Sequence, residues 1–399
     1  MNLKMFLNQE SKLKNNMKKL AIIGQGFVGT AVREKFKKTF TVLTYDKYNS
    51  DLSNTYTLDS KLYSNHNLKD LIEHCDVIFL CVPTPMFEDG ECDVSIVESV
   101  IKEISLICDS LDNKQVTVVL KSTVPPGTTS KLNDISKLVT IAFSPEFLTE
   151  ANSIEDFDKQ DRIVLGVDYA ELVDQLTDIF STAFPHANIV YMYSKEAEMS
   201  KYITNLFLAT KVSFFNDMYS ICESLGVDFN SSMSAVMLDP RIGKSHTQVP
   251  GPDGDRGYGG HCFPKDMSAI LYIADANKIR VPTLIGADLT NRLNRTNKDW
   301  EKMEGRAVSK RNEFELPNNV IGLESPFFFL NPNNPLQLMY DGASVPSDWT
   351  GIEVRDFLEG ELLQEPKENE IIYRYTPTRG YILSIELEKE SSVNLNFQD

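Results

Sequence analysis

A glycine-rich turn is the feature that most restricts the fold of this 399-residue chain. The segment GQGFVG places Gly24, Gly26 and Gly29 directly after an apolar run and at the start of a helical pattern. The first glycine permits a tight turn, the second lets the backbone approach a pyrophosphate at a helix N-terminus, and the third allows close helix–strand packing. The alternative is a strand–helix turn that uses glycine for packing alone.

Asp46 favours the first of these alternatives and selects the cofactor. It ends the next apolar run, about twenty residues after the turn. An acidic side chain at this position binds the adenosine ribose hydroxyls and repels the additional phosphate of NADP. The pattern therefore predicts NAD as the cofactor and a binding site that contains Gly24, Gly26, Phe27, Val28, Gly29 and Asp46.

Further apolar runs alternate with helical patterns through the first half of the chain. The expected strands lie in the segments KKLAIIG, TVLTYD, CDVIFLCVPTP, QVTVVLKSTVPPG, LVTIAFSPEF and DRIVLGV. Near-continuous apolar strands that alternate with helices are typical of a parallel sheet covered on both faces. Residues 18–195 are therefore predicted to form an α/β domain of the doubly wound, Rossmann type.

The remaining segments differ in character. Residues 196–300 have helical periodicity, with Gly226 as the expected cap of a long helix, and are predicted to form a helical central domain. They are interrupted by the Gly/Pro-rich loop of residues 249–261. Residues 301–399 are predicted to be a small β-rich module of unknown role, with two strands joined by a turn at residues 379–380. Residues 1–17 are expected to be a polar leader.

Charge and composition exclude several function classes. The formal net charge of −17 disfavours nucleic acid as a partner, because phosphate binding needs clustered Lys and Arg. No stretch approaches the roughly 18 apolar residues of a membrane helix, and the N-terminus lacks the apolar core of a secretory signal. A cytoplasmic protein without a membrane partner is therefore expected. The six cysteines form no CxxC or zinc-ligand spacing, so neither a metal site nor a disulfide framework is expected.

Cys262 is the cysteine with a reactive setting. It lies in the segment GYGGHCFPKD, just before a predicted helix, where the helix dipole would lower the pKa of its thiol. Asp266 follows four residues later and shares the helix face if the helix has begun. A lone cysteine usually serves packing, but a packing residue has no need of the flanking Gly259 and Gly260. His261 is not favoured as a partner base, because adjacent residues rarely face each other.

Two further pairs carry chemistry. Lys201 and Asn205 are four apart in a predicted helix, so they share a face and could stabilise a developing negative charge. The alternative for Lys201 is a chain that merely extends to solvent. Glu146 and Glu150 follow a predicted strand and could act as base or water-positioning groups. The alternative interpretation is that the two glutamates lie at a helix N-terminus and only complement its dipole.

Hydroxyl side chains stand at two strand exits that should border the same crevice. Thr84 follows the strand of CDVIFLCVPTP, and Ser122 and Thr123 follow the strand of QVTVVLKSTVPPG. The alternative for all three is ordinary turn chemistry.

Taken together, these segments resemble the UDP-glucose/GDP-mannose dehydrogenase family, and within it most the UDP-glucose 6-dehydrogenases. The resemblance covers residues 18 to about 297 and is carried, in family order, by GQGFVG, STVPPGTT, SPEFLTEA, SKYITNLFLATKVSFFND, DPRIG and GYGGHCFPKD. It implies an NAD-dependent, four-electron oxidation of a nucleotide-sugar C6 alcohol to a uronic acid, with UDP-glucose favoured as the substrate. The resemblance further implies that the product serves polysaccharide biosynthesis.

The resemblance also implies roles for individual residues. Cys262 would form a thiohemiacetal and then a thioester, and Lys201 and Asn205 would stabilise the oxyanions. Thr123, Glu146 and Asp266 would position and deprotonate water or the substrate hydroxyl. The cofactor site would also contain Thr84, Ser122, Thr123, Glu150 and Lys265. The substrate site would contain Glu146, Phe147, Leu148, Lys201, Asn205, Arg241, Tyr258 and Gly259. Arg241 would reach across the interface of a homodimer built on the long helix.

The chain departs from the family at one point. Members continue into a second Rossmann-like domain that helps to bind the nucleotide, and no such pattern follows residue 300. Either the last module or a partner replaces that domain, or turnover is impaired. Competing interpretations are a GDP-mannose or UDP-N-acetyl sugar dehydrogenase, a two-electron β-hydroxyacid dehydrogenase with no use for Cys262, and a non-catalytic binding protein that kept the fold.

Overall fold

The computed structural model describes residues 18–57, 60–149 and 152–311, together with the backbone of five strands between residues 327 and 383. The chain divides into two compact units, Met1–Ser309 and Lys310–Asp399. The expected polar leader and Glu150 lie outside the described residues.

The first unit is built on a nine-stranded sheet of order β4-β3-β2-β1-β5-β6-β7-β8-β9. Its strands are β1 (Lys19–Ile23), β2 (Thr41–Tyr45), β3 (Asn54–Thr57), β4 (Ser60–Tyr63), β5 (Val77–Leu80), β6 (Val116–Leu120), β7 (Val139–Phe143), β8 (Arg162–Gly166) and β9 (Asn188–Met192). Neighbouring strands from β2 to β7 pair in parallel, which confirms the predicted Rossmann-type α/β class.

Three pairings in this sheet are antiparallel and were not predicted. β3 and β4 extend the sheet beyond β2 as a hairpin, and β8 meets β7 at the single pair Phe143 and Gly166. The hairpin strands read NTYT and SKLY, so they lack the continuous apolar run that identified the other strands. β8 and β9 pair in parallel with each other and complete this edge of the sheet.

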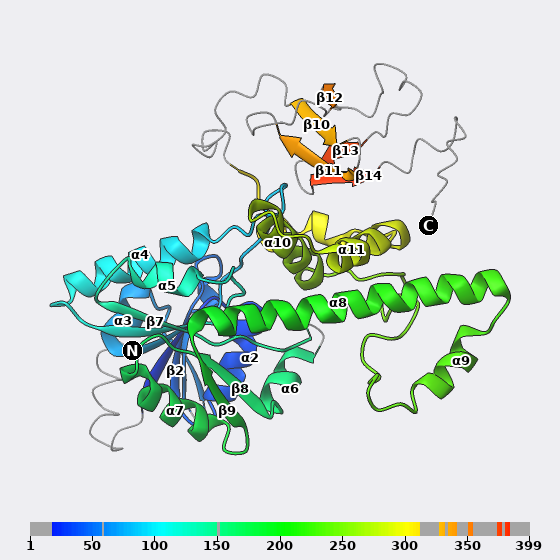
Figure 1. The fold of residues 1–399 in the computed structure, drawn as a ribbon. Helices are drawn as coiled ribbons and strands as arrows, with labels where there is room; N and C mark the ends of the chain where they lie inside the picture. The colour runs from blue at the N-terminus through cyan, green and yellow to red at the C-terminus, as the bar shows by residue number, and fades with distance from the viewer. Residues whose placement is uncertain are drawn as a thin grey trace. The chain divides into compact units, whose positions relative to one another are not determined.

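Helices cover both faces of the sheet and create a separate core on each (Figure 1). α3 (Leu68–His74), α4 (Ser95–Ser110) and α5 (Thr128–Asn133) cover one face, where Leu71, Ile101 and Leu132 are buried. α2 (Phe27–Phe36), α6 (Ser153–Asp158) and α7 (Glu171–Ala183) cover the other, which is rich in aromatic rings. The ring centroids of Phe36 and Phe79 lie 4.8 Å apart there. The continuous apolar strands follow from this double burial.

A long helix, α8 (Ser194–Leu225), leads from the sheet to the central domain (Figure 1). It ends at Gly226, whose φ of 66° gives the left-handed cap that the sequence predicted. α9 (Phe229–Val236), α10 (Cys262–Ala276) and α11 (Pro282–Asn294) follow, and α10 and α11 pack on α8 through Tyr202, Met267 and Ala287. α11 ends at Asn294, and the short 3-10 helix η3 (Asp299–Lys302) follows.

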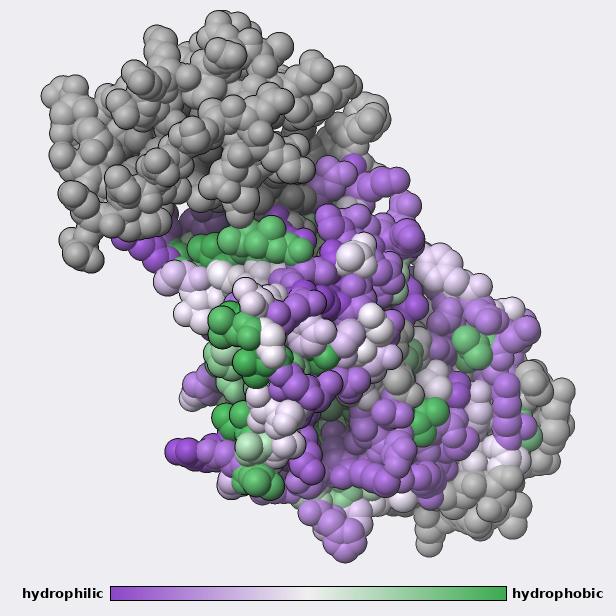
Figure 2. Space-filling view, turned by 90° about the vertical axis from the view of Figure 1, so that its right-hand side faces the viewer, coloured by the Kyte–Doolittle hydropathy of each residue, from purple (hydrophilic) through white to green (hydrophobic). Residues whose placement is uncertain are grey.

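One face of α8 carries apolar side chains that the first unit leaves exposed. They are Met199, Ile203, Phe207, Phe214, Ile221 and Leu225, with Phe207 66% and Leu225 72% exposed. At about 100° per residue these positions fall within roughly 80° of helix surface. Figure 2 shows the side of the molecule on the right of Figure 1, where exposed apolar side chains stand among hydrophilic ones.

The second unit contributes five described strands. β10 (Phe327–Asn331) pairs antiparallel with β11 (Asn334–Tyr340) and with β12 (Thr350–Glu353). β13 (Tyr373–Thr376) and β14 (Gly380–Leu383) form a hairpin, which confirms the two strands predicted around residues 379–380. Among the residues that the structure describes, none forms a helix both long and apolar enough to cross a bilayer.

Candidate active site

The glycine turn lies where the strand order reverses, between β1 and β5, which is the position of ligand crevices in open α/β sheets. Gly24 has a φ of 85°, and a Cβ there would lie 2.3 Å from the carbonyl oxygen of Cys81. A Cβ on Gly29 would lie 1.9 Å from the oxygen of Gly24. A Cβ on Gly26 would meet nothing within 4 Å. Two glycines therefore serve packing, whereas the middle one faces space that fits a bound pyrophosphate.

The side chain of Asp46 is hydrogen-bonded directly to this turn. Its Oδ2 accepts a hydrogen bond of 2.9 Å from the backbone N–H of Gln25. Its Oδ1 accepts from the N–H groups of Tyr48 and Asn49 at 3.0 and 3.1 Å. These amides hold the carboxylate at the end of β2, beside the glycine turn, as an NAD ribose site requires.

The hydroxyls at the strand exits link neighbouring segments. Oγ1 of Thr84 donates to the carbonyl oxygen of Thr123 at 2.7 Å, and Oγ of Ser122 donates to that of Val82 at 2.7 Å. A hydroxyl has a single proton, so both groups can only accept a hydrogen bond from a ligand. Thr84 and Ser122 are buried and Thr123 is partly buried, beside the crevice.

Lys201 and Glu146 form a buried ion pair between α8 and the exit of β7. Nζ of Lys201 lies 3.0 Å from Oε1 of Glu146 and donates to the backbone oxygen of the same residue at 2.7 Å. Burial acts to lower the pKa of Lys201, but the surrounding groups, of which the charge of Glu146 is the strongest, together outweigh it and the pKa is raised. Oε2 of Glu146 is buried without a hydrogen-bond partner among the described residues. The pair therefore offers a fixed cation and one unused carboxylate oxygen.

Asn205 lies one helical turn after Lys201, as predicted, and reaches α10. Its Nδ2 donates to Oδ2 of Asp266 at 2.6 Å, and Nζ of Lys265 lies 2.6 Å from Oδ1 of the same carboxylate. Burial acts to lower the pKa of Lys265, but Asp266 raises it. Both oxygens of Asp266 are therefore occupied, and the ammonium of Lys265 is held by that carboxylate.

Cys262 is the first residue of α10, four residues before Asp266, so the two share a helix face as expected. The residue is partly exposed, yet its thiol is desolvated. Burial raises the pKa of the thiol to about 12, although the charge of Lys201 acts to lower it. The expected lowering of the pKa is therefore wrong, because desolvation outweighs the nearby cations.

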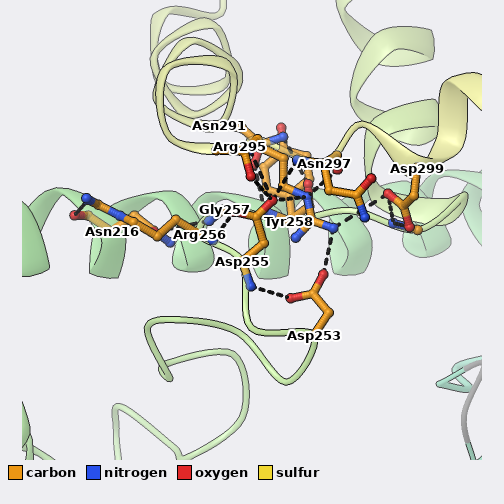
Figure 3. Close-up of polar contacts among 12 residues, drawn as sticks. Asn216, Asp253, Asp255, Arg256, Gly257, Tyr258, Asn291, Arg295, Asn297 and Asp299 are labelled. Atoms are coloured by element: carbon orange, nitrogen blue, oxygen red, sulfur yellow. Dashed lines mark hydrogen bonds and ion pairs between the residues drawn. The ribbon is translucent and has the colours of Figure 1, made fainter.

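Side chains of α8 and α11 hold the loop that carries Cys262 (Figure 3). Oδ1 of Asn291 accepts from the N–H of Tyr258 at 2.6 Å, and its Nδ2 donates to the oxygen of Tyr258 at 3.1 Å. Oδ1 of Asn216 accepts from the N–H of Gly257 at 3.1 Å. A Cβ on Gly257 would lie 2.3 Å from Oδ1 of Asn291, so this close approach requires glycine.

The loop also meets the glycine turn. The ring of Phe27, the first residue of α2, packs edge-on against the ring of His261 with centroids 5.1 Å apart. Val28 packs against the core on that side of the sheet. His261 thus contacts Phe27, a residue of the predicted cofactor site.

The predicted substrate residues are only partly brought together. Phe147 lies beside the ion pair, with Nζ of Lys201 5.7 Å from its ring centroid, and Leu148 packs against the sheet core. Tyr258 is buried, and its Oη has no hydrogen-bond partner among the described residues. Arg241 is not part of the buried cluster, because its side chain is 88% exposed and is paired with Asp239.

Lys121 is a buried charged residue that the sequence did not single out. Its Nζ donates to Oγ of Ser144 and to the oxygen of Pro145, each at 3.2 Å. Burial lowers its pKa to about 8. The only signal in the sequence was a lysine at the exit of an apolar strand. No group of three or more His, Cys, Asp or Glu suited to a metal ion occurs among the described residues.

Two models of the UDP-glucose/GDP-mannose dehydrogenase family match the sequence, its NAD binding domain at residues 40–184 and its central domain at residues 195–293. The UDP-glucose 6-dehydrogenase TuaD of Bacillus subtilis is 33% identical over 287 residues, which are 65% of this chain and 59% of that protein. The UDP-glucose 6-dehydrogenase of Rickettsia bellii is 37% identical over 239 residues, 59% and 52% of the two chains. The chain thus spans little more than half the length of these relatives.

Solved structures agree with this assignment. A UDP-glucose dehydrogenase from the archaeon Pyrobaculum islandicum superposes with a TM-score of 0.60 at 28% identity, covering 70% of this chain and 69% of that one. A Mycobacterium tuberculosis 3-hydroxyisobutyrate dehydrogenase, with a TM-score of 0.52 at 14% identity, shares the fold alone. Because the two family models together cover more than half of its residues, this chain belongs to the UDP-glucose/GDP-mannose dehydrogenase family and contains that family's NAD-binding and central domains.

Proposed function

We propose that this protein oxidises the C6 alcohol of a nucleotide sugar to the carboxylate with NAD, and that UDP-glucose is the sugar. One observation carries the proposal: a buried set of Lys201, Asn205, Asp266 and Glu146 surrounds the helix start that bears Cys262. The relatives named UDP-glucose 6-dehydrogenase support the choice of sugar. Bound NAD supplies the hydride acceptor, and the open side of Gly26 and the carboxylate of Asp46 fit its pyrophosphate and ribose.

The reaction needs two oxidations at one carbon. The alcohol first loses a hydride and a proton to give an aldehyde. The sulfur of Cys262 then adds to the carbonyl carbon, and its proton ends on the carbonyl oxygen as a thiohemiacetal. Loss of a second hydride and proton gives a thioester, and water cleaves the carbon–sulfur bond to release the carboxylate and the thiol. Four electrons leave in two hydrides.

Lys201 and Asn205 suit the stabilisation of the oxyanions in this sequence. The ammonium of Lys201 has three N–H donors, and Glu146 takes two of them. The amide of Asn205 has two donors, and Asp266 takes one. Each residue can therefore direct one remaining donor at an oxygen on C6. Preorganised donors of this kind typically contribute about 100-fold or more to the rate.

Proton transfer assigns a role to Glu146. Since burial raises the pKa of the Cys262 thiol to about 12, the sulfur is protonated before attack and needs a base. Both oxygens of Asp266 are engaged by Asn205 and Lys265, whereas Oε2 of Glu146 has no partner among the described residues. We therefore assign proton acceptance and water positioning to Glu146, and orientation of Asn205 to Asp266.

Counting NADH per sugar tests the proposal. Limiting amounts of UDP-glucose, GDP-mannose and UDP-N-acetyl sugars are incubated with the full chain and excess NAD, and absorbance at 340 nm is followed to completion. We expect two NADH per UDP-glucose. A Cys262→Ser variant should bind the sugar and lose turnover. One NADH per substrate would support a two-electron dehydrogenase, and none with any sugar would support a binding protein that kept the fold.

We also propose that the exposed apolar face of α8 forms the interface of a homodimer. The six exposed side chains span the helix from Met199 to Leu225 on one face. Contiguous apolar surface of this kind marks an interaction site, and a second copy of the same helix offers a complementary one. Arg241 is exposed in one chain and could complete the substrate site of the partner.

A further inference from the structure

Arg295 sits at the centre of a charged cluster that includes Asp253 and Asp255 of the loop before Cys262 (Figure 3). Its side chain is 1% exposed. Its Nη2 lies 2.6 Å from Oδ2 of Asp253 and 3.5 Å from Oδ1 of Asp299, and its Nε lies 3.5 Å from Oδ2 of Asp255. One guanidinium is therefore shared by three carboxylates, and it is the cation that separates their negative charges. Two of these come from the loop and one comes from the segment after α11.

This cluster joins the loop to the segment that follows α11. Both carboxylate oxygens of Asp299 accept from the N–H of Gly260 at 3.1 Å, two residues before Cys262. Oδ2 of Asp255 accepts from the N–H of Asn297 at 2.7 Å. A Cβ on Gly259 would lie 2.2 Å from Nη2 of Arg295. The backbone of Gly259 and Gly260, just before Cys262, is thus in direct contact with the guanidinium of Arg295 and the carboxylate of Asp299.

The same segment continues to the wall of the cofactor crevice. The N–H of Met86, in the exit of β5, donates to the oxygen of Ala307 at 2.9 Å. The N–H of Ser309 donates to the oxygen of Met86 at 2.8 Å, and its Oγ donates to Oδ2 of Asp93 at 2.7 Å. Met86, Ala307 and Trp300 also form a small apolar cluster. Residues 295–309 therefore bridge the Cys262 loop and the strand exit that carries Thr84.

We propose that Arg295 is a positioning residue that fixes the sulfur of Cys262 relative to the cofactor site. Without the guanidinium, Asp253, Asp255 and Asp299 would face one another as like charges, and the loop would move away from residues 295–309. The consequence for turnover rests on the proposed function, whereas the position of the thiol does not. A displacement of about 1 Å from the reactive geometry costs on the order of 100-fold in rate.

The test removes the positive charge of Arg295 in one variant and that of the nearby Arg292 in another, and compares the two. Arg295→Met removes the guanidinium and keeps a chain of similar reach. Arg292→Met is the matched control, because Arg292 is paired with Asp288 at 2.5 Å within α11 rather than with Asp253, Asp255 or Asp299. Asp299→Ala and Asp299→Asn form a second pair, in which Asn keeps an acceptor for the N–H of Gly260. This pair keeps the test decisive if Arg295→Met fails to fold.

Alkylation of Cys262 by iodoacetamide, followed by mass spectrometry in the full chain, reports the position of the thiol without any sugar. Release of the loop should hydrate the sulfur, so we expect alkylation at least about fivefold faster in Arg295→Met and Asp299→Ala. Wild-type rates are expected in Arg292→Met and Asp299→Asn. The buried Cys75 and Cys108 should stay unmodified in every variant, which separates local release from unfolding.

Turnover and NAD binding complete the test. In Arg295→Met we expect kcat with UDP-glucose to fall by about 10- to 100-fold and the Kd for NAD to change less than twofold. Wild-type alkylation of Cys262 in a folded Arg295→Met or Asp299→Ala variant would overturn the proposal, as would fast alkylation in Arg292→Met. If the wild-type chain oxidises no sugar, the proposed function fails, and the alkylation rates still decide the role of Arg295.

Discussion

The thiol of Cys262 should behave as a weak acid whose reactivity is limited by deprotonation. Burial raises its pKa from the ordinary 9.0 to about 12, and Lys201 is the strongest of the groups that oppose this shift. Such a shift corresponds to about 4 kcal/mol against the thiolate. At pH 8 the thiolate fraction is then on the order of one in ten thousand, about a thousandfold below that of an unshifted thiol.

Alkylation rates between pH 7 and pH 10 measure this property. The rate for Cys262 should rise tenfold per pH unit throughout this range, because the thiolate is the reactive species and its fraction stays small. Lys201→Met removes the main stabilising charge and should lower the rate at every pH. Lys195→Met, which changes an exposed lysine at the start of the same helix, should leave it unchanged.

A plateau with a midpoint below pH 9 would refute this reasoning, because it would mean that a thiolate already exists in the resting protein. The assignment of a base to Cys262 would then be unnecessary. Equal rates in the wild type and Lys201→Met would show instead that the charge of Lys201 does not act on the sulfur.

Three further outcomes are expected. Gly26→Ala should abolish NAD binding measured by calorimetry while leaving the urea midpoint unchanged, whereas Gly29→Ala should destabilise the fold, because only the second Cβ meets backbone of the protein itself. Glu146→Gln leaves the buried ammonium of Lys201 without its counter-ion and should lower the free energy of unfolding by roughly 3 kcal/mol in urea titrations; an unchanged midpoint would contradict the buried ion pair. Phe207→Asp should convert a homodimer to a monomer in light scattering, and a monomeric wild type would refute the proposed interface.

Local sequence patterns were sufficient for the parts of the site that lie within a few residues of one another. The glycine turn and the position of Asp46 follow from a strand, a turn and a helix in immediate succession. The loop of residues 249–261 predicted a helix just after Cys262, and α10 begins at Cys262 itself. The helical spacing of Lys201 and Asn205 was predictable for the same reason. By contrast, the short polar strands β3 and β4 carry no apolar run and escaped prediction.

The sequence by itself therefore determined the Rossmann-type class and the cofactor turn, and it predicted which residues carry the chemistry. The tertiary structure decided which partners these residues have and in which direction their pKa values shift. Lys201 meets Glu146 across 55 positions of the chain, and Asn205 meets Asp266 across 61. Desolvation of Cys262 and the ion pairs of Arg295 with Asp253 and Asp255 likewise arise from elements distant in sequence. Burial and charge pairing depend on what folding brings together, so no local pattern can determine the sign of a pKa shift or the partner of a buried charge.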